Sequence, residues 1–191
     1  MATRPGERKL QILQTLAAML EQPAGEKITT AALAARLDVS EAALYRHFAS
    51  KAQMYEGLIE FIESSLFGVI NKITAEEENG MRQAHAIVAL LLNFAEKNPG
   101  MTRVLVGDAL VHENPRLQAR INQLHDRLEA TLKQCLRVAA AQGGGSADTD
   151  EVAARANLML SYVVGRWHQF AKSGFKRLPT ELFEQQWAFL A

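Results

Sequence analysis

The chain has 191 residues, of which 48% are hydrophobic and 22% charged, a composition that excludes a disordered or collagen-like protein. Its 21 basic residues balance 21 acidic ones, so the net charge gives no argument for a nucleic-acid partner; the single cysteine, Cys135, excludes an intrachain disulfide. The N-terminal residues lack the apolar stretch of a signal peptide, and no window reaches the roughly 18 apolar residues of a membrane-spanning helix. We therefore expect a cytoplasmic protein.

Apolar residues recur at spacings of three and four along nearly the whole chain, which predicts an all-α fold with about nine helices. The first predicted helix covers about residues 7–21, and the Pro-Ala-Gly of residues 23–25 ends it. One apolar stripe along it is expected to face the core: Leu10, Leu13, Leu16, Ala17 and Leu20.

Two short helices and one long helix are expected next. Thr29 and Ser40 each stand just before a short helical pattern, and each hydroxyl can accept backbone N–H bonds and so cap a helix. Asp38 and Val39 form a tight turn between the two short helices. Ser50 begins a long amphipathic helix that ends near residues 76–80.

The second half of the chain predicts four further helices. They cover about residues 81–97, 102–110, 115–142 and 150–173, and the Gly-rich residues 143–146 form a flexible linker before the last of them. Two long apolar helices late in a chain are what a four-helix dimer interface requires, because each protomer contributes two. We therefore expect a homodimer that forms through the C-terminal helices.

Residues 28–51, ITTAALAARLDVSEAALYRHFASK, have the proportions of a helix-turn-helix. Three small residues are expected to let the two helices pack closely: Ala32, Ala35 and Ala43. Five larger ones are expected to fill the interior: Leu33, Leu37, Val39, Leu44 and Phe48.

The second helix of this motif is the candidate DNA-reading element. A recognition helix presents its first residues to base edges in the major groove, and four residues qualify there: Ser40, Ala42, Ala43 and Arg46. Five others suit phosphate contacts: Thr29, Thr30, Tyr45, His47 and Lys51. An N-terminal arm with Arg4, Arg8 and Lys9 could add salt-sensitive contacts. The alternative is a generic pair of amphipathic helices with a solvated Tyr-Arg-His face.

The same segment resembles the DNA-binding domain of TetR-type regulators, in its Tyr45-x-x-Phe48 core and in Lys51 three residues later. That resemblance implies a DNA-binding domain at residues 1–50, a helical dimerisation and partner-binding domain at 51–191, and palindromic sites on double-stranded DNA. One departure is Asp38, which stands where many such proteins have glycine. Aspartate tolerates a left-handed backbone, so the turn is expected to form.

Further segments resemble one branch of that family, the SlmA nucleoid occlusion factors: LIEFIESSL (58–66), LLLNFAEKNPGMTRVLVGDAL (90–110) and RLQARINQLHDRLEATLKQCLR (116–137). The resemblance implies a DNA-bound protein that antagonises assembly of the division protein FtsZ, and so a location at the nucleoid. It also implies docking of the FtsZ tail at Phe61, Leu90, Asn93, Phe94, Lys97 and Asn98. Val69 departs from the pattern, since relatives can carry a basic residue there. Without the resemblance, Phe61, Leu90 and Phe94 are expected to be plain interhelical core.

Two other functions are alternatives to DNA-bound inhibition of FtsZ. A ligand-responsive repressor would need a C-terminal pocket, for which the candidates are Trp167, His168, Tyr162, His112 and His125. An enzyme is disfavoured, because the sequence has no phosphate-binding Gly loop, nucleophile elbow or metal-ligand spacing. No catalytic residue, metal or cofactor is expected.

Overall fold

A computed structural model describes residues 5–22, 28–143 and 148–191. Within these ranges every regular element is helical, as predicted, with nine α-helices and one 3-10 helix. They are α1 (Pro5–Leu20), α2 (Thr30–Arg36), α3 (Glu41–Tyr45), α4 (Lys51–Glu76), α5 (Gly80–Lys97), α6 (Pro99–Leu105), η1 (Asp108–Leu110), α7 (Pro115–Gln142), α8 (Thr149–Lys172) and α9 (Phe183–Leu190). Arg4 and the expected loops at 23–25 and 144–146 lie outside the described residues.

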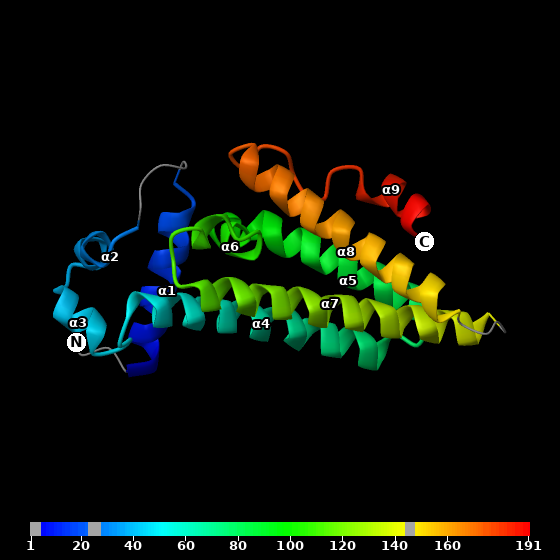
Figure 1. The fold of residues 1–191 in the computed structure, drawn as a ribbon, viewed down its shortest axis with the longest axis horizontal. Helices are drawn as coiled ribbons and strands as arrows, with labels where there is room; N and C mark the ends of the chain where they lie inside the picture. The colour runs from blue at the N-terminus through cyan, green and yellow to red at the C-terminus, as the bar shows by residue number, and fades with distance from the viewer. Residues whose placement is uncertain (1–4, 23–27, 144–147) are drawn as a thin grey trace.

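The helices form a small head and a long body (Figure 1). Helices α1, α2 and α3 gather at one end, while α4, α5, α7 and α8 run along the long axis. Helix α6 packs between α1 and the body, and α9 packs on α8 towards the opposite end. The head thus projects from one end of a helical bundle.

The core of the body forms where α5, α7 and α8 meet. Trp167 on α8 is fully buried there, and its indole N–H donates to the Leu91 carbonyl of α5 at 3.0 Å. Gly80, at the start of α5, lies so close to α7 that an added Cβ would collide with the Cys135 carbonyl oxygen. The bundle is therefore closely packed at both the large and the small side chains.

Helix α1 is joined to the body by α6. Gly100 on α6 lies against the backbone of Ala17 on α1, and a Cβ there would collide with the Ala17 carbonyl oxygen. The Arg103 guanidinium donates to the Leu20 carbonyl at 3.2 Å and to the Gln22 carbonyl at 3.4 Å, at the end of α1. These contacts satisfy carbonyl groups that a helix end leaves without partners.

Two predicted details are wrong. The expected helix at 102–110 begins earlier, at Pro99, because proline suits the first turn of a helix; it ends at Leu105, because Gly107 adopts φ 79° and starts η1 separately. In α1, Leu10 is exposed and Ile12 is buried, so the inward stripe passes through Ile12, Leu16 and Leu20, which are four residues apart.

Candidate nucleic-acid interface

Three side chains cap α2 and α3 of the head and the adjoining α4, as the sequence predicts. The Thr29 hydroxyl accepts the Ala32 N–H at 3.1 Å and starts α2. The Ser40 hydroxyl accepts the Ala43 N–H at 3.3 Å and starts α3. Ser50 caps α4 in the same way. Each cap satisfies a donor that the helix itself cannot, so the three starts are fixed by local sequence.

The turn between α2 and α3 depends on Asp38, whose φ of 53° is left-handed. The Val39 N–H reaches back to the Ala34 carbonyl at 3.0 Å, the closing bond of a Schellman-type helix end. The expectation that aspartate would support this turn is confirmed. The turn sets the angle at which α3 leaves α2.

The interior of the head differs from the prediction in one respect. Leu33, Leu37, Leu44 and Phe48 are buried and Val39 is half-buried, as expected, and Ala43 is half-buried too. Ala32 and Ala35 are exposed, however, and the buried alanine is Ala34. Ala34 lies three residues before Leu37 and beside Leu33, so these three form the inward stripe of α2.

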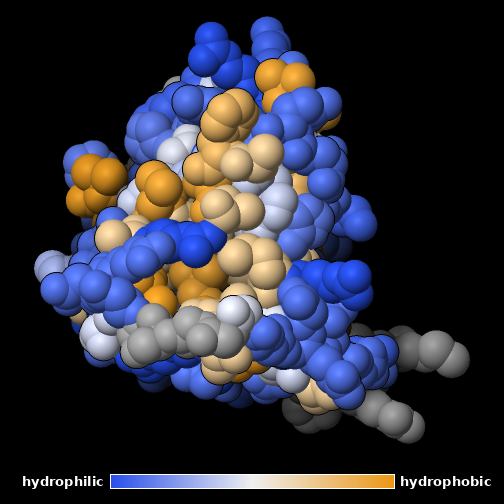
Figure 2. Space-filling view, turned by 90° about the vertical axis from the view of Figure 1, so that its right-hand side faces the viewer, coloured by the Kyte–Doolittle hydropathy of each residue, from blue (hydrophilic) through white to orange (hydrophobic). Residues whose placement is uncertain are grey.

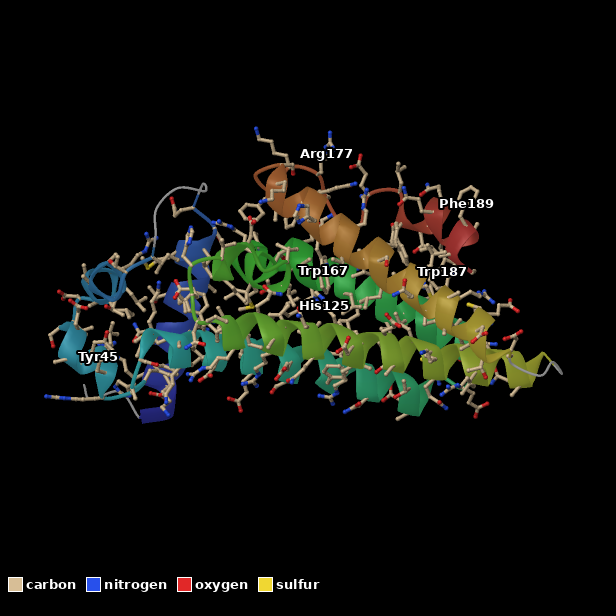
Figure 3. All side chains as sticks on the ribbon, in the orientation of Figure 1. Tyr45, His125, Trp167, Arg177, Trp187 and Phe189 are labelled. Carbon is tan, nitrogen blue, oxygen red and sulfur yellow. The ribbon has the colours of Figure 1, made fainter. Side chains whose placement is uncertain are left out.

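Helix α3 presents most of its candidate contact residues outward. Ser40, Ala42 and Arg46 are exposed, Tyr45 is 44% exposed at the outer end of the head (Figure 3), and His47 is half-buried. Arg46 makes no ion pair with any other described residue. The face therefore offers a free cation beside small side chains, a combination suited to a groove of DNA.

A polar cluster joins the start of α2 to α3. The Thr30 hydroxyl donates to the Glu41 carboxylate at 2.6 Å, and the Tyr45 hydroxyl donates to the Thr30 oxygen at 3.5 Å. Glu41 was not among the predicted site residues, and no local signal pairs it with Thr30, eleven positions away. The cluster holds the Thr30 and Tyr45 hydroxyls next to each other.

The side chain of Lys51 contacts residues of the body. Its ammonium pairs with the Glu113 carboxylate and stands 5.7 Å from the centre of the Tyr55 ring, and 21% of the side chain is exposed. The sequence places Lys51 among the phosphate contacts, but its charge here is neutralised by an acid 62 positions further along the chain.

The six residues expected to bind a partner lie on two packed helices, α4 and α5. Phe61 is 38% exposed on α4, and Leu90 and Phe94 of α5 are half-buried against the core. Asn93 and Lys97 are exposed. Asn98 ends α5, with its amide donating to the Phe94 carbonyl at 2.8 Å. The set therefore combines interhelical packing with an exposed aromatic ring and an exposed cation.

The residues considered for a C-terminal ligand pocket do not meet in one cavity. Trp167 is sealed in the core, with His125 beside it at 6.0 Å between ring centres (Figure 3). The Tyr162 hydroxyl bonds Gln186 at 2.7 Å, and His112 and His168 are exposed. Burial lowers the pKa of His125, whose Nε2 is buried without a hydrogen-bond partner. This imidazole is consequently held in its neutral form.

A metal-ligand cluster and a membrane-spanning helix are both absent from the described part of the chain. Its His, Cys, Asp and Glu side chains form no group of three that could hold a metal ion. None of its helices is long and apolar enough to span a membrane.

Family models and solved structures agree with this geometry. Residues 12–58 match the model of bacterial regulatory proteins of the tetR family, and residues 78–191 match the SlmA-like model of the tetracyclin repressor-like C-terminal domain. The structure resembles a TetR transcription regulator from Haloarcula marismortui, with a TM-score of 0.79 and 15% identity over 97% of each chain. It also resembles FadR from Bacillus subtilis, solved with stearoyl-CoA, with a TM-score of 0.76 and 13% identity over 95% of this chain and 96% of that one. The chain belongs to the TetR family.

Relatives with similar sequences show to which branch of the TetR family the chain belongs. The nucleoid occlusion factor SlmA of Idiomarina loihiensis is 55% identical over 98% of this chain and 95% of its own length. The SlmA protein of Alteromonas mediterranea is 54% identical over the same shares of the two chains. Within the TetR family, the chain is a member of the SlmA nucleoid occlusion factors.

Proposed function

We propose that this protein binds palindromic DNA sites as a homodimer and, once bound, inhibits FtsZ assembly over the chromosome. The observation that carries the proposal is the 55% identity to a nucleoid occlusion factor over 98% of the chain. In this proposal residues 1–50 read DNA, residues 51–191 dimerise and bind the partner, and the protein resides on the nucleoid in the cytoplasm. A ligand-responsive repressor is less well supported, because its candidate pocket residues lie apart.

The DNA-binding part of the proposal assigns α3 to the major groove. Base edges would be contacted by Ser40, Ala42, Ala43 and Arg46, and phosphates by Thr29, Thr30, Tyr45, His47 and Lys51. The exposure of Arg46 and the capped start of α3 support this docking. A phosphate contact by Lys51 requires that its ammonium leave Glu113, so a phosphate and a carboxylate compete for one cation.

The dimer part of the proposal uses the outer face of α8. Ala154, Leu158, Ser161 and Gly165 recur there at helical spacing and are all exposed. A Cβ added at Gly165 would meet no other atom within 4 Å, so the face has room for a second helix. Figure 2 shows apolar residues in a band across the end of the molecule that carries the start of α8. A two-fold pairing would present two α3 helices to half-sites about 34–36 Å apart.

The partner part of the proposal assigns the FtsZ tail to the surface formed by Phe61, Leu90, Asn93, Phe94, Lys97 and Asn98. The exposed Phe61 ring can take apolar side chains, and the exposed Lys97 can attract an acidic segment that becomes ordered on binding. Val69 is exposed on α4 and contributes no charge to this surface.

The test separates the two activities with one charge reversal. Palindromic sites are first recovered by mapping where the protein binds in the genome of its own organism, and FtsZ sedimentation is then measured with and without such DNA. Lys97→Glu is expected to retain DNA affinity and to lose inhibition of FtsZ. Lys176→Glu, a reversal at an exposed lysine beyond α8, is the matched control and should keep both. Equal loss of both activities in Lys97→Glu would argue against a separate FtsZ surface.

A further inference from the structure

Internal partners already occupy donors that the proposed function assigns to DNA phosphates. The Thr30 hydroxyl donates to the Glu41 carboxylate at 2.6 Å, and the Tyr45 hydroxyl donates to the Thr30 oxygen at 3.5 Å. The Lys51 ammonium pairs with the Glu113 carboxylate. Both sets of contacts therefore end on a carboxylate, one within the head and one in the body.

Glu41 competes with a phosphate for the Thr30 hydroxyl. A hydroxyl carries one proton, so Thr30 can donate it to the carboxylate or to a phosphate, but not fully to both. Tyr45 depends on the same bond, because its own proton is directed to the Thr30 oxygen. Glu41 is exposed and forms no ion pair with another described residue. Its negative charge therefore also repels the backbone of a duplex bound at α3.

Glu113 holds Lys51 away from bulk water. The Lys51 side chain is 21% exposed and that of Glu113 is 13% exposed, and the Tyr55 ring centre lies 5.7 Å from the ammonium. A partly buried charge pair is screened little by salt, and removal of one partner leaves the other as an uncompensated charge. A phosphate that takes Lys51 must therefore leave Glu113 without its cation.

We propose that Glu41 and Glu113 occupy, in the free protein, the places that DNA phosphates take in the complex. A carboxylate and a phosphate offer the same kind of anionic oxygen to hydroxyl and ammonium donors, so one can replace the other. The two acids keep these donors in position, and they lower the affinity for DNA because each must first be displaced. Phosphate contacts are common to all sequences, so the affinity is lowered on any duplex. This inference rests on the proposed docking of α3.

The proposal is tested by fluorescence anisotropy of the full-length protein with a labelled palindromic site and with a labelled duplex of unrelated sequence. Glu113→Gln should raise the affinity for both duplexes roughly tenfold, because a neutral amide competes less well for Lys51. Glu41→Gln should raise both affinities about threefold, since the bond that it weakens lies at the surface.

Asp38→Asn is the matched control for the loss of a charge alone. Asp38 is an exposed acid of the same head, its side chain makes no hydrogen bond to another described residue, and asparagine also tolerates its left-handed backbone. This variant should leave both affinities nearly unchanged. Thermal unfolding of each variant shows that it is folded.

Two double variants show whether each acid acts through its donor. In a Lys51→Ala background Glu113→Gln should have no further effect, and in a Thr30→Val background Glu41→Gln should have none. The proposal is overturned if neither single glutamine variant gains affinity, or if the gains persist in these backgrounds. If Lys51→Ala and Thr30→Val bind both duplexes as tightly as the parent does, the docking of α3 fails as well. Weaker binding by these two variants without a gain from the glutamines would overturn this inference alone.

Discussion

Arg46 and Lys51 are five positions apart, yet their side chains have different surroundings. Arg46 is exposed at the end of α3, whereas Lys51 is held by Glu113 beside the Tyr55 ring. A cation that is free to reach a base edge contributes to specificity, and one that reaches a phosphate contributes to affinity on any sequence. The two residues should therefore respond differently to substitution.

We predict that Arg46→Ala weakens binding to the specific site by about 1–3 kcal/mol with little effect on unrelated DNA. Lys51→Ala should weaken binding to all sequences and reduce the slope of log affinity against log salt by about one. Fluorescence anisotropy over a KCl series measures both effects, with Arg137→Ala, an exposed arginine of α7, as the control. Unchanged affinity in both variants would refute the docking of α3.

His125 is the residue whose environment predicts a pH effect. Burial lowers its pKa in the folded protein, so below about pH 6.5 the unfolded chain takes up a proton before the folded one does. The contribution of neutral His125 to the free energy of unfolding is therefore complete above about pH 6.5. It is lost as the pH falls towards the pKa of His125 in the folded protein. The free energy of unfolding therefore changes by at most about 1.4 kcal/mol per pH unit because of His125.

Urea unfolding at pH 7.5 and 5.5 measures this effect. The free energy of unfolding of the parent protein should fall relative to that of His125→Gln as the pH is lowered, because glutamine does not titrate. His168→Gln, a change at an exposed histidine of the neighbouring helix α8, should follow the parent instead. If the difference between parent and His125→Gln is the same at both pH values, folding does not lower the pKa of His125.

At the scale of helices, local signals were sufficient for three helix starts and for the turn between α2 and α3. Thr29, Ser40 and Ser50 cap helices as predicted, and Asp38 forms the left-handed turn, because each depends on residues no more than a few positions away. The outward face of α3 followed from the same periodicity. Its contacts with DNA, and those of the proposed FtsZ surface, remain predictions.

Features that depend on distant residues could not be predicted. The pairing of Lys51 with Glu113 joins positions 62 apart, and no spacing rule indicates it. Helix α9 had no predicted bounds; it is held by tertiary contacts, in which His85 of α5 packs against Phe183 and Trp187 at 5.0 and 4.9 Å between ring centres. Packing between helices, rather than helix propensity, decides such positions.

The close approach of α1 and α6 gives a prediction at this scale. Gly100→Ala should destabilise the protein by about 1–3 kcal/mol, because its Cβ meets the Ala17 carbonyl oxygen and must push the two helices apart. Gly68→Ala should stabilise by about 0.5–1 kcal/mol, since Gly68 lies within α4 and an added Cβ finds open space. Thermal unfolding followed by circular dichroism compares the two. If both variants shift the unfolding temperature in the same direction, the close packing of α1 on α6 is contradicted.

At the scale of the whole molecule, DNA affinity should depend on the pairing of two heads. We predict that Leu158→Arg, which places a charge on the outer face of α8, converts the protein to a monomer of 21.1 kDa and lowers its affinity for a palindrome. Asn71→Arg, at an exposed position on α4, is the control. Light scattering after size-exclusion chromatography measures the mass. If the Leu158→Arg protein remains a dimer, the dimer interface does not lie on the outer face of α8.

Helix α4 is one unbroken rod from the head to the far end of the body. Its 26 residues extend about 39 Å at 1.5 Å per residue. A tilt of about 5° around the Glu76 end would carry the Lys51 end about 3 Å, close to the rise of one base pair. In a DNA complex, side chains that pack α4 along the body would therefore influence where each head lies on the duplex without touching the DNA.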